Sequence, residues 1–195
     1  MENKEIRKET VERKISTPLT YEKIKDLKAG DTILLTGTIY SARDAAHKRL
    51  IDLLDSGHDL PINIKGEAIY YVGPSPAKKG QVIGSAGPTT SYRMDAYSPR
   101  LLELGLKAMI GKGARNQEVV DSIVKNKAVY LGAIGGAAAL ISKSIVSSEI
   151  IAYEDLGAEA IRKMKVIDMP LIVIIDVNGN NLYKVGQEAY LKSMK

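Results

Sequence analysis

The sequence of 195 residues contains no cysteine, no tryptophan and no phenylalanine. Without cysteine the chain can form no disulfide, offers no thiolate nucleophile or cysteine zinc site, and cannot hold an iron–sulfur cluster by itself. Its only histidines are His47 and His58, so a metal site on this chain would depend on carboxylates. Since tyrosine is the only aromatic residue type present, we expect an aliphatic core.

Long hydrophobic runs are also missing. The longest, at residues 171–177, is far shorter than the roughly 20 apolar residues of a membrane-spanning helix. The N-terminus has no secretory signal pattern, which together with the lack of cysteine predicts a cytoplasmic protein without membrane contact. No linker or repeat divides the chain, so we expect one domain over residues 1–195, with residues 1–19 as an extended N-terminal arm or edge strand.

The formal net charge of +5 favours an anionic partner such as nucleic acid, a membrane surface or a small polyanionic metabolite. Acidic and basic residues alternate through residues 2–14, and no run of basic residues is free of acids. A basic stripe or aromatic platform for nucleic acid is therefore not indicated. A small anion is the favoured ligand class.

Hydrophobic patterning predicts an α/β fold, and because several neighbouring strands lack a helix between them, the sheet should be mixed. Strands are predicted at residues 31–40, 67–72, 81–84, 127–134 and 171–176, and residues 161–167 alternate apolar and polar side chains. Helices are predicted at residues 21–29, 45–54, 99–110, 117–126 and 137–145. Ser41 and Asp44 have capping-box spacing before the second helix, and Asn178-Gly179 predicts a type I′ hairpin.

Residues 84–95 carry the densest functional signal. Two glycines permit close backbone approach, and Pro88 stiffens the turn. Four hydroxyl side chains, at residues 89–92, directly precede Arg93. Backbone N–H groups and hydroxyls beside a guanidinium form a nest for a carboxylate or phosphate. The alternative is a hydroxyl-rich surface loop without function.

Two further cations occupy comparable positions. Arg43 begins a predicted helix directly after a strand, where the helix N-terminus favours anions, and Lys112 lies between two glycines. The alternatives are that Arg43 pairs with an acid and that His47 lies on the helix surface. Residues 105–113 do not have Walker A spacing, and residues 132–140 lack a dinucleotide-binding pattern, so a nicotinamide enzyme is not predicted.

Arg43, Arg93 and Lys112 together suit a small dicarboxylate, because a guanidinium can bind a carboxylate through two parallel hydrogen bonds. The chain shows no Ser-His-Asp set, no paired acid motif and no metal cluster. The residues alone thus predict an anion-binding α/β domain that completes an active site on another chain.

Four segments, in this order and spacing, resemble a known family. Residues 31–50, 73–95, 111–113 and 135–140 are similar to the β subunit of class I (iron–sulfur) fumarate hydratases and tartrate dehydratases, which equals the C-terminal domain of the single-chain forms. The resemblance extends from Thr20 to Tyr183. Residues 158–170 depart from it, since the family more usually has an aromatic residue there, and we expect this to affect packing.

The resemblance implies a swivelling β/β/α fold and one half of a hydro-lyase that converts fumarate and malate. It implies a cysteine-bearing α subunit that holds a four-iron, four-sulfur cluster, with no cofactor on this chain. Arg43 and Arg93 would clamp the two carboxylates of a C4 dicarboxylate, Lys112 would add positive charge, and Thr89 would contact the carbon where the proton moves. Whether Thr89 acts as the base or only orients substrate stays open, because a free hydroxyl is a poor base.

Three alternatives remain at this stage. One is a tartrate dehydratase β subunit, since the same arginines would grip either C4 dicarboxylate. Another is a freestanding homologue with a different substrate, and the third is a non-catalytic module that binds anions or nucleic acid. Isolated from its partner, the chain is expected to self-associate through the surface left uncovered.

Overall fold

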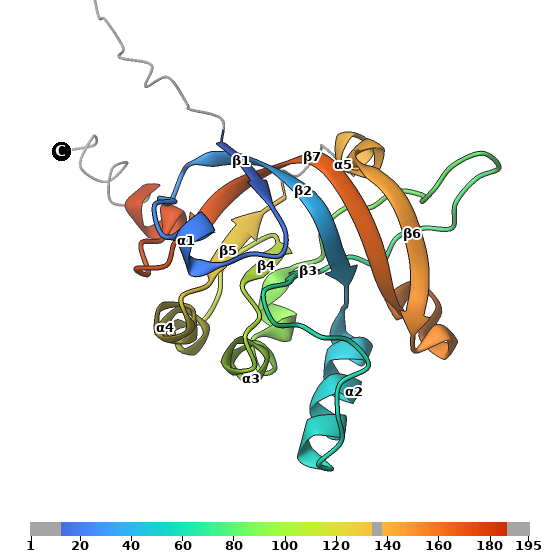
Figure 1. The fold of residues 1–195 in the computed structure, drawn as a ribbon, viewed down its shortest axis with the longest axis horizontal. Coiled ribbons are helices and arrows are strands. Elements are labelled where there is room, and N and C mark those ends of the chain that lie inside the picture. The colour runs from blue at the N-terminus through green and yellow to red at the C-terminus, as the bar shows by residue number, and fades with distance from the viewer. Residues whose placement is uncertain (1–12, 134–137, 187–195) are drawn as a thin grey trace, which may run out of the picture.

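The computed structural model describes residues 13–133 and 138–186. Within these residues the chain forms a sheet with the strand order β1-β2-β3-β4-β5-β7-β6, flanked by helices (Figure 1). The strands are β1 (Arg13–Ser16), β2 (Thr32–Ser41), β3 (Ala68–Tyr70), β4 (Ala108–Gly111), β5 (Val129–Gly132), β6 (Ile145–Ala152) and β7 (Ile161–Ile175). The helices are α1 (Tyr21–Ile24), α2 (Asp44–Asp55), α3 (Ser98–Glu103), α4 (Gln117–Asn126) and α5 (Ala138–Ser144), with short 3-10 helices η1 (Ser91–Met94) and η2 (Glu154–Glu159).

The sheet is mixed, as predicted. Strands β1 to β5 run parallel to their neighbours, whereas β7 runs antiparallel to β2, β5 and β6. Because β7 pairs with both β2 and β5, the strands β2, β3, β4, β5 and β7 form a closed ring. The predicted α/β class, with a mixed sheet and flanking helices, is confirmed.

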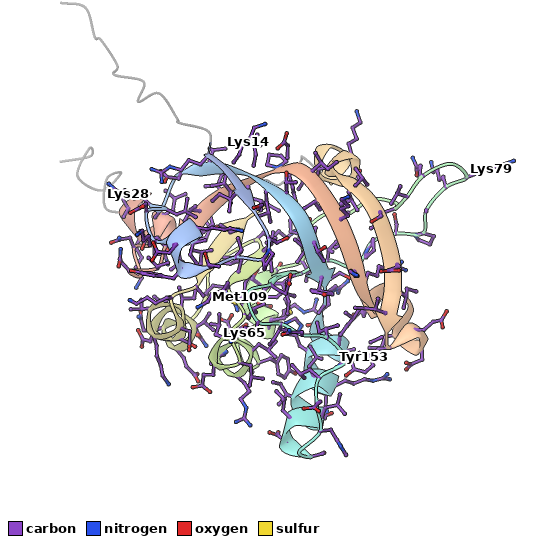
Figure 2. All side chains as sticks on the ribbon, viewed as in Figure 1. Lys14, Lys28, Lys65, Lys79, Met109 and Tyr153 are labelled. Atoms are coloured by element: carbon purple, nitrogen blue, oxygen red, sulfur yellow. The ribbon has the colours of Figure 1, made fainter. Side chains whose placement is uncertain are left out.

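Alternation of side chains along the strands creates two cores. Tyr70 and Ile110 belong to a cluster built from one face of the strands. Ile69, Met109 and Tyr130 point to the opposite face and pack with apolar residues of α2, α3 and α4. Figure 1 shows these three helices along one side of the sheet, and Figure 2 shows Met109 on that side.

The predicted helix over residues 99–110 is wrong in its second half. The helix α3 ends at Glu103, and Gly105 follows with a φ of 100°, a left-handed conformation that glycine adopts readily and that ends the helix. Residues Ala108–Gly111 instead form β4, which is buried between β3 and β5. A fully buried short strand shows no alternation, so its apolar run continued the helical pattern.

The strand predicted at residues 81–84 is also wrong. The Ser75 N–H donates to the Ser85 carbonyl (3.0 Å) and the Ser85 N–H donates to Ser75 Oγ (2.8 Å). These bonds fold the segment back on itself as part of the long loop after β3. Figure 2 shows Lys79 at the outer end of this loop.

Two predicted local motifs are wrong as well. Ser41 caps no helix, because it ends β2 and its hydroxyl accepts the Arg162 N–H (3.1 Å), and α2 begins after Arg43. The Asn178-Gly179 segment forms a turn organised by Asp176, whose carboxylate accepts the Asn178 N–H (2.9 Å). Only Gly179 has a positive φ there, so a type I′ turn, which needs two such residues, is absent from this described turn.

Other boundaries also differ from prediction. The helix predicted over residues 21–29 is limited to Tyr21–Ile24, although Ile24 and Leu27 are both buried. The strand β6 was not predicted, because its edge position exposes side chains on both faces. In the expected N-terminal arm, Arg13–Ser16 form the edge strand β1, and residues 1–12 lie outside the described residues, as do residues 134–137 of the glycine-rich segment.

Among residues 13–133 and 138–186, no helix is both long and apolar enough to cross a membrane.

Candidate functional site

The candidate site lies where the carboxyl ends of parallel strands meet. Strand β2 leads into Arg43, β3 leads into the loop of residues 73–90, and β4 leads into Lys112. Ligand sites of α/β sheets form at this end of the strands. The topology therefore brings the predicted residues to one end of the sheet although they are distant in the sequence.

Arg43 is held at the junction between β2 and α2. It is the N-cap residue of α2, and its Nη2 atom lies 3.6 Å from Glu159 Oε1. The other carboxylate oxygen of Glu159 accepts the Ala45 N–H at 2.9 Å, so Glu159 ties η2 to the first turn of α2. A Cβ atom on Gly73 would lie 2.6 Å from Arg43 Nη1, so this glycine leaves the space that the guanidinium occupies.

Asp44 connects the two predicted arginines. Its Oδ1 atom lies 2.7 Å from Arg93 Nε, and its Oδ2 atom lies 3.7 Å from Arg43 Nε. The side chain of Arg43 is 21% exposed and that of Arg93 is 46% exposed. The alternative interpretation, that Arg43 pairs with an acid, is confirmed, because Arg43 makes long ion pairs with Asp44 (3.7 Å) and Glu159 (3.6 Å).

Thr89 and Lys112 lie on neighbouring backbone segments. The Thr89 N–H donates to the Tyr71 carbonyl (2.7 Å), Thr90 forms a parallel bridge with Lys112, and the Ser91 N–H donates to the Lys112 carbonyl (2.8 Å). The Thr89 hydroxyl makes no hydrogen bond to any residue that the structure describes, and Thr89 is half-buried. This hydroxyl is available to a ligand.

Close packing sets the distance between these two segments. A Cβ atom on Gly111 would lie 2.0 Å from Ser91 Oγ and 3.0 Å from Tyr71 Cδ2. Ser91 Oγ also accepts a hydrogen bond from the Tyr130 hydroxyl (2.9 Å). Burial raises the pKa of Tyr130, so its hydroxyl stays protonated and donates.

A buried ion pair lies beneath the same two segments. Arg115 Nε donates to Asp95 Oδ1 (2.6 Å) and Arg115 Nη2 donates to Ser98 Oγ (2.6 Å). The guanidinium lies between the rings of Tyr71 and Tyr130, at 5.4 and 5.1 Å from their centroids. Burial opposes this charge, but the neighbouring Tyr71 and Asp95 raise the pKa of Arg115, so it stays charged.

His47 does not lie on the helix surface, as one alternative expected, but is fully buried. Its Nδ1 atom is 2.9 Å from the Arg43 carbonyl, and its ring meets the Tyr71 ring edge to face at 5.3 Å. Burial lowers the pKa of His47 to about 4, so the imidazole is neutral and donates from Nδ1. His47 therefore supports the backbone of Arg43 from inside the core.

The arrangement can bind an anion with two acidic groups. The two guanidiniums reach one carboxylate, and Lys112 and Thr89 belong to the next two segments of the same end of the sheet. Among the residues that the structure describes, no three His, Asp or Glu side chains lie close enough to bind a metal ion.

Sequence reasoning missed the acids of the site. Asp44 directly follows Arg43 in the sequence, so an ion pair between the two could have been predicted. The capping-box interpretation instead gave Asp44 a role at the start of the helix. Glu159 is separated from Arg43 by more than a hundred residues, and no local pattern links the two. Asp95 ends the segment of residues 84–95, and Arg115 lies two residues after Gly113, yet no local pattern shows that these two residues pair.

Comparison with known proteins gives a consistent result. A family model described as the fumarase C-terminus matches residues 1–186. The anaerobic class I fumarate hydratase of Escherichia coli is 45% identical over 152 residues, which are 77% of this chain and 28% of that protein. A protein of Methanocaldococcus jannaschii named "Putative L(+)-tartrate dehydratase subunit beta" is 37% identical over 181 residues, which are 89% of this chain and 93% of that protein. The chain thus spans under a third of the first fumarate hydratases it matches, but nearly all of the archaeal subunit.

Proposed function

Because the chain belongs to the family of the fumarase C-terminus, we propose that it is the β subunit of an iron–sulfur-dependent hydro-lyase and supplies the dicarboxylate-binding half of the active site. The proposed reaction is the reversible hydration of fumarate to malate. The proposed partner is an α subunit that contributes the other half.

The observation that supports this proposal best is the convergence of Arg43 and Arg93. They come from segments about fifty residues apart in sequence, and both meet the carboxylate of Asp44. A guanidinium presents several N–H donors in a plane that matches a carboxylate. Two such groups, with Lys112 at the same end of the sheet, suit a ligand with two carboxylates.

Thr89 is proposed to contact the carbon at which the proton is exchanged. In hydration, water adds its oxygen to one carbon of the double bond and a proton is added to the other, so a group near the second carbon must handle that proton. The hydroxyl of Thr89 is available, and Lys112 lies on the paired segment. Positive charge there favours an ionised hydroxyl, which a base would require.

An iron–sulfur cluster does not fit this chain alone. Such clusters are held mainly by cysteine thiolates, and the chain has no cysteine. In the proposed enzyme the α subunit would hold the cluster, and this chain would bind and orient the dicarboxylate.

A tartrate dehydratase β subunit is the second candidate. The chain spans 93% of the archaeal relative whose name contains that activity, whereas it spans 28% of the Escherichia coli fumarate hydratase. Both substrates are C4 dicarboxylates, so the arginine pair would serve either reaction.

Reconstitution tests the proposal. The chain is mixed anaerobically with a cysteine-bearing α subunit of the same family, and hydration of fumarate and dehydration of L-tartrate are measured. We expect turnover of one of the two only when both chains are present. Turnover by this chain alone, or none of either substrate by the complex, would refute the proposal, and the preferred substrate decides between the two candidates.

Variants of the complex test the assigned residues. Removing one partner of a desolvated charge pair costs about 2–5 kcal/mol, so Arg43→Ala and Arg93→Ala should each lower kcat/KM by roughly 30-fold to several thousand-fold. Arg93→Lys should also fail, because an ammonium lacks the planar fork. Thr89→Val keeps the shape, so kcat should fall steeply while KM changes little.

Lysines at the outer end of the loop after β3 provide controls. Lys78 and Lys79 are exposed, and Lys79 projects away from the body of the molecule (Figure 2). Lys78→Ala and Lys79→Ala should leave kcat/KM unchanged. Near-normal kinetics of both Arg43→Ala and Arg93→Ala would disprove the clamp.

A further inference from the structure

We propose that Asp44 is a positioning residue that anchors both Arg43 and Arg93 by their Nε atoms and so orients Nη donors of the guanidiniums toward the ligand. This inference rests on the proposed function, because it concerns the same dicarboxylate site. It adds an acidic residue to a site otherwise assigned to cations and a hydroxyl.

The contacts of Asp44 carry the inference. Asp44 Oδ1 is 2.7 Å from Arg93 Nε, and Asp44 Oδ2 is 3.7 Å from Arg43 Nε. Both Asp44 Oδ2 and Arg43 Nε are shielded from water and have no hydrogen-bond partner. A shift of less than 1 Å, of the order by which catalytic contacts tighten when substrate binds, would join these two unpaired atoms.

The backbone explains why Asp44 can act as a fixed point. Asp44 is the first residue of α2, whose start is held by the hydrogen bond from the Ala45 N–H to Glu159 (2.9 Å). Its side chain is short, and only 27% of it is exposed. An anchor on a rigid element can hold two long, flexible arginine side chains in one orientation.

The atoms that remain unpaired point to the ligand. A guanidinium carries one N–H at Nε and four at its two Nη atoms. In the described residues, no Nη atom of Arg43 or Arg93 makes a hydrogen bond, and the nearest acid, Glu159, is 3.6 Å from Arg43 Nη2. Arg43 Nη2 is thus shared with Glu159, whereas Arg93 pairs with no described acid other than Asp44, and its Nη donors are left for substrate.

Charge gives a second reason for an acid here. Two guanidiniums and an ammonium in one site repel one another when no ligand is bound. The carboxylate of Asp44 lies between the two arginines and offsets part of that repulsion. The competing interpretation is that Asp44 occupies Arg93 in place of substrate, and it predicts an effect of opposite sign.

The first test observes the anchor directly, without activity. The full chain is labelled with ¹⁵N, and the Nε–H signals of Arg43 and Arg93 are assigned with Arg43→Lys and Arg93→Lys. We expect Asp44→Asn to shift both signals. Asp52→Asn is the matched control, since Asp52 is on the same helix and pairs with the exposed Lys48. Both signals unchanged, or only one shifted, would overturn the shared anchor.

The second test measures the consequence in the reconstituted complex. Loss of a charge-assisted contact is worth about a 10- to 100-fold change, so replacing the ion pairs of Asp44 in Asp44→Asn should raise KM for the dicarboxylate by that factor. We expect kcat and the melting temperature to change little, Asp44→Glu to be intermediate, and Asp52→Asn to match the wild type. An unchanged or lowered KM would overturn the positioning role and favour competition.

The two tests also separate this inference from the proposed function. If the wild-type complex turns over neither fumarate nor tartrate, the proposed function fails, whereas the NMR result still decides whether Asp44 anchors both arginines.

Discussion

Two regions hold the start of α2 from opposite sides, and they use polar groups differently. The loop side, residues 84–95 and 111–116, places the ion pair of Arg115 and Asp95 in the interior, with side chains 0% and 9% exposed. The hairpin side, residues 145–161, meets α2 through Asp155 and Arg49, whose side chains are 63% and 40% exposed. Figure 1 shows β6 and β7 reaching down toward α2 on that side.

Because of this difference, the two sides should contribute differently to the stability of the domain. A buried ion pair that loses one partner leaves an uncompensated charge in the interior, whereas an exposed ion pair contributes little because water screens it. The loop side should therefore determine stability and site geometry together. The hairpin side should adjust the position of Arg43 through Glu159 without determining whether the domain folds.

Arg115→Met should have the largest effect. It leaves the Asp95 carboxylate buried without its guanidinium, which costs about 3–5 kcal/mol of unfolding free energy. The contacts of the guanidinium with the rings of Tyr71 and Tyr130 are lost as well. Urea unfolding followed by far-UV circular dichroism measures the loss.

A double variant makes this prediction sharper. Arg115→Met combined with Asp95→Asn removes both charges, so its cost should be smaller than the sum of the two single costs. The exposed pair of Lys125 and Glu103 is the control, and Glu103→Gln should leave the midpoint nearly unchanged. Additive costs would contradict a coupled buried pair.

His47 predicts how the loop side responds to acid. Its pKa is about 4 in the folded chain, lowered first by burial and also by the charge of Arg115, and about 6.5 when unfolded. Between these values the unfolded state binds more protons, so stability falls as pH decreases from about 6.5 to about 4, by about 3 kcal/mol in total. Below about pH 4 both states are protonated and this contribution changes no further.

The measurement is urea unfolding of wild type and His47→Gln across this pH range. The variant should lack the part of the pH dependence that belongs to this residue. His58 is the exposed histidine, and His58→Gln should behave as wild type. Identical pH profiles for wild type and His47→Gln would show that burial does not keep His47 neutral.

Much of this fold could be predicted where local patterns agree with burial. The strand β2 and the helix α4, with Asn116 as its cap, follow their patterns closely, since Asn116 Oδ1 accepts the Val119 N–H at 2.9 Å. β4 could not be distinguished from a helix continuation, because burial on both faces removes the period of two. β6 could not be found because an edge strand exposed on both faces has no hydrophobic pattern.

The site shows the same division. Arg43, Arg93 and Lys112 stand out because glycine-rich or hydroxyl-rich segments surround them in sequence. The ion pair of Asp95 and Arg115 could not be predicted, because only the fold brings their two loops together. The contact of Glu159 with Arg43 could not be predicted either, because Glu159 belongs to the hairpin side. Local chemistry thus predicts the groups proposed to face a ligand, whereas the acids and the arginine that pack around them depend on topology.

Gly111→Ala tests how tightly the loop side is packed. The added methyl group would lie 2.0 Å from Ser91 Oγ, and such overpacking typically costs about 1–3 kcal/mol. The shift should also separate Thr89 from Lys112 and lower kcat/KM of the reconstituted complex about tenfold or more. Gly186→Ala is the control, since among the described residues nothing lies within 4 Å of its Cβ position. Unchanged kinetics and stability would show that the two segments are not closely coupled.

Asp155→Asn should have the smallest effect. Asp155 Oδ1 accepts a hydrogen bond from Arg49 Nη1 at 2.8 Å, and this bond lowers the pKa of Asp155. A carboxylate whose pKa is lowered in the folded state stabilises the fold at pH values above its unfolded pKa. This contribution is lost as the pH falls through the folded pKa, and exposure to water keeps it small. The Arg49 guanidinium also lies 5.2 Å from the centre of the Tyr153 ring, and this contact survives the substitution. We therefore expect the melting temperature to fall by about 2 °C or less, with the difference vanishing in about 1 M salt, and KM to stay constant. A loss comparable to that of Arg115→Met would mean that the hairpin side, despite its exposed ion pairs, determines the stability of the domain as strongly as the buried loop side does.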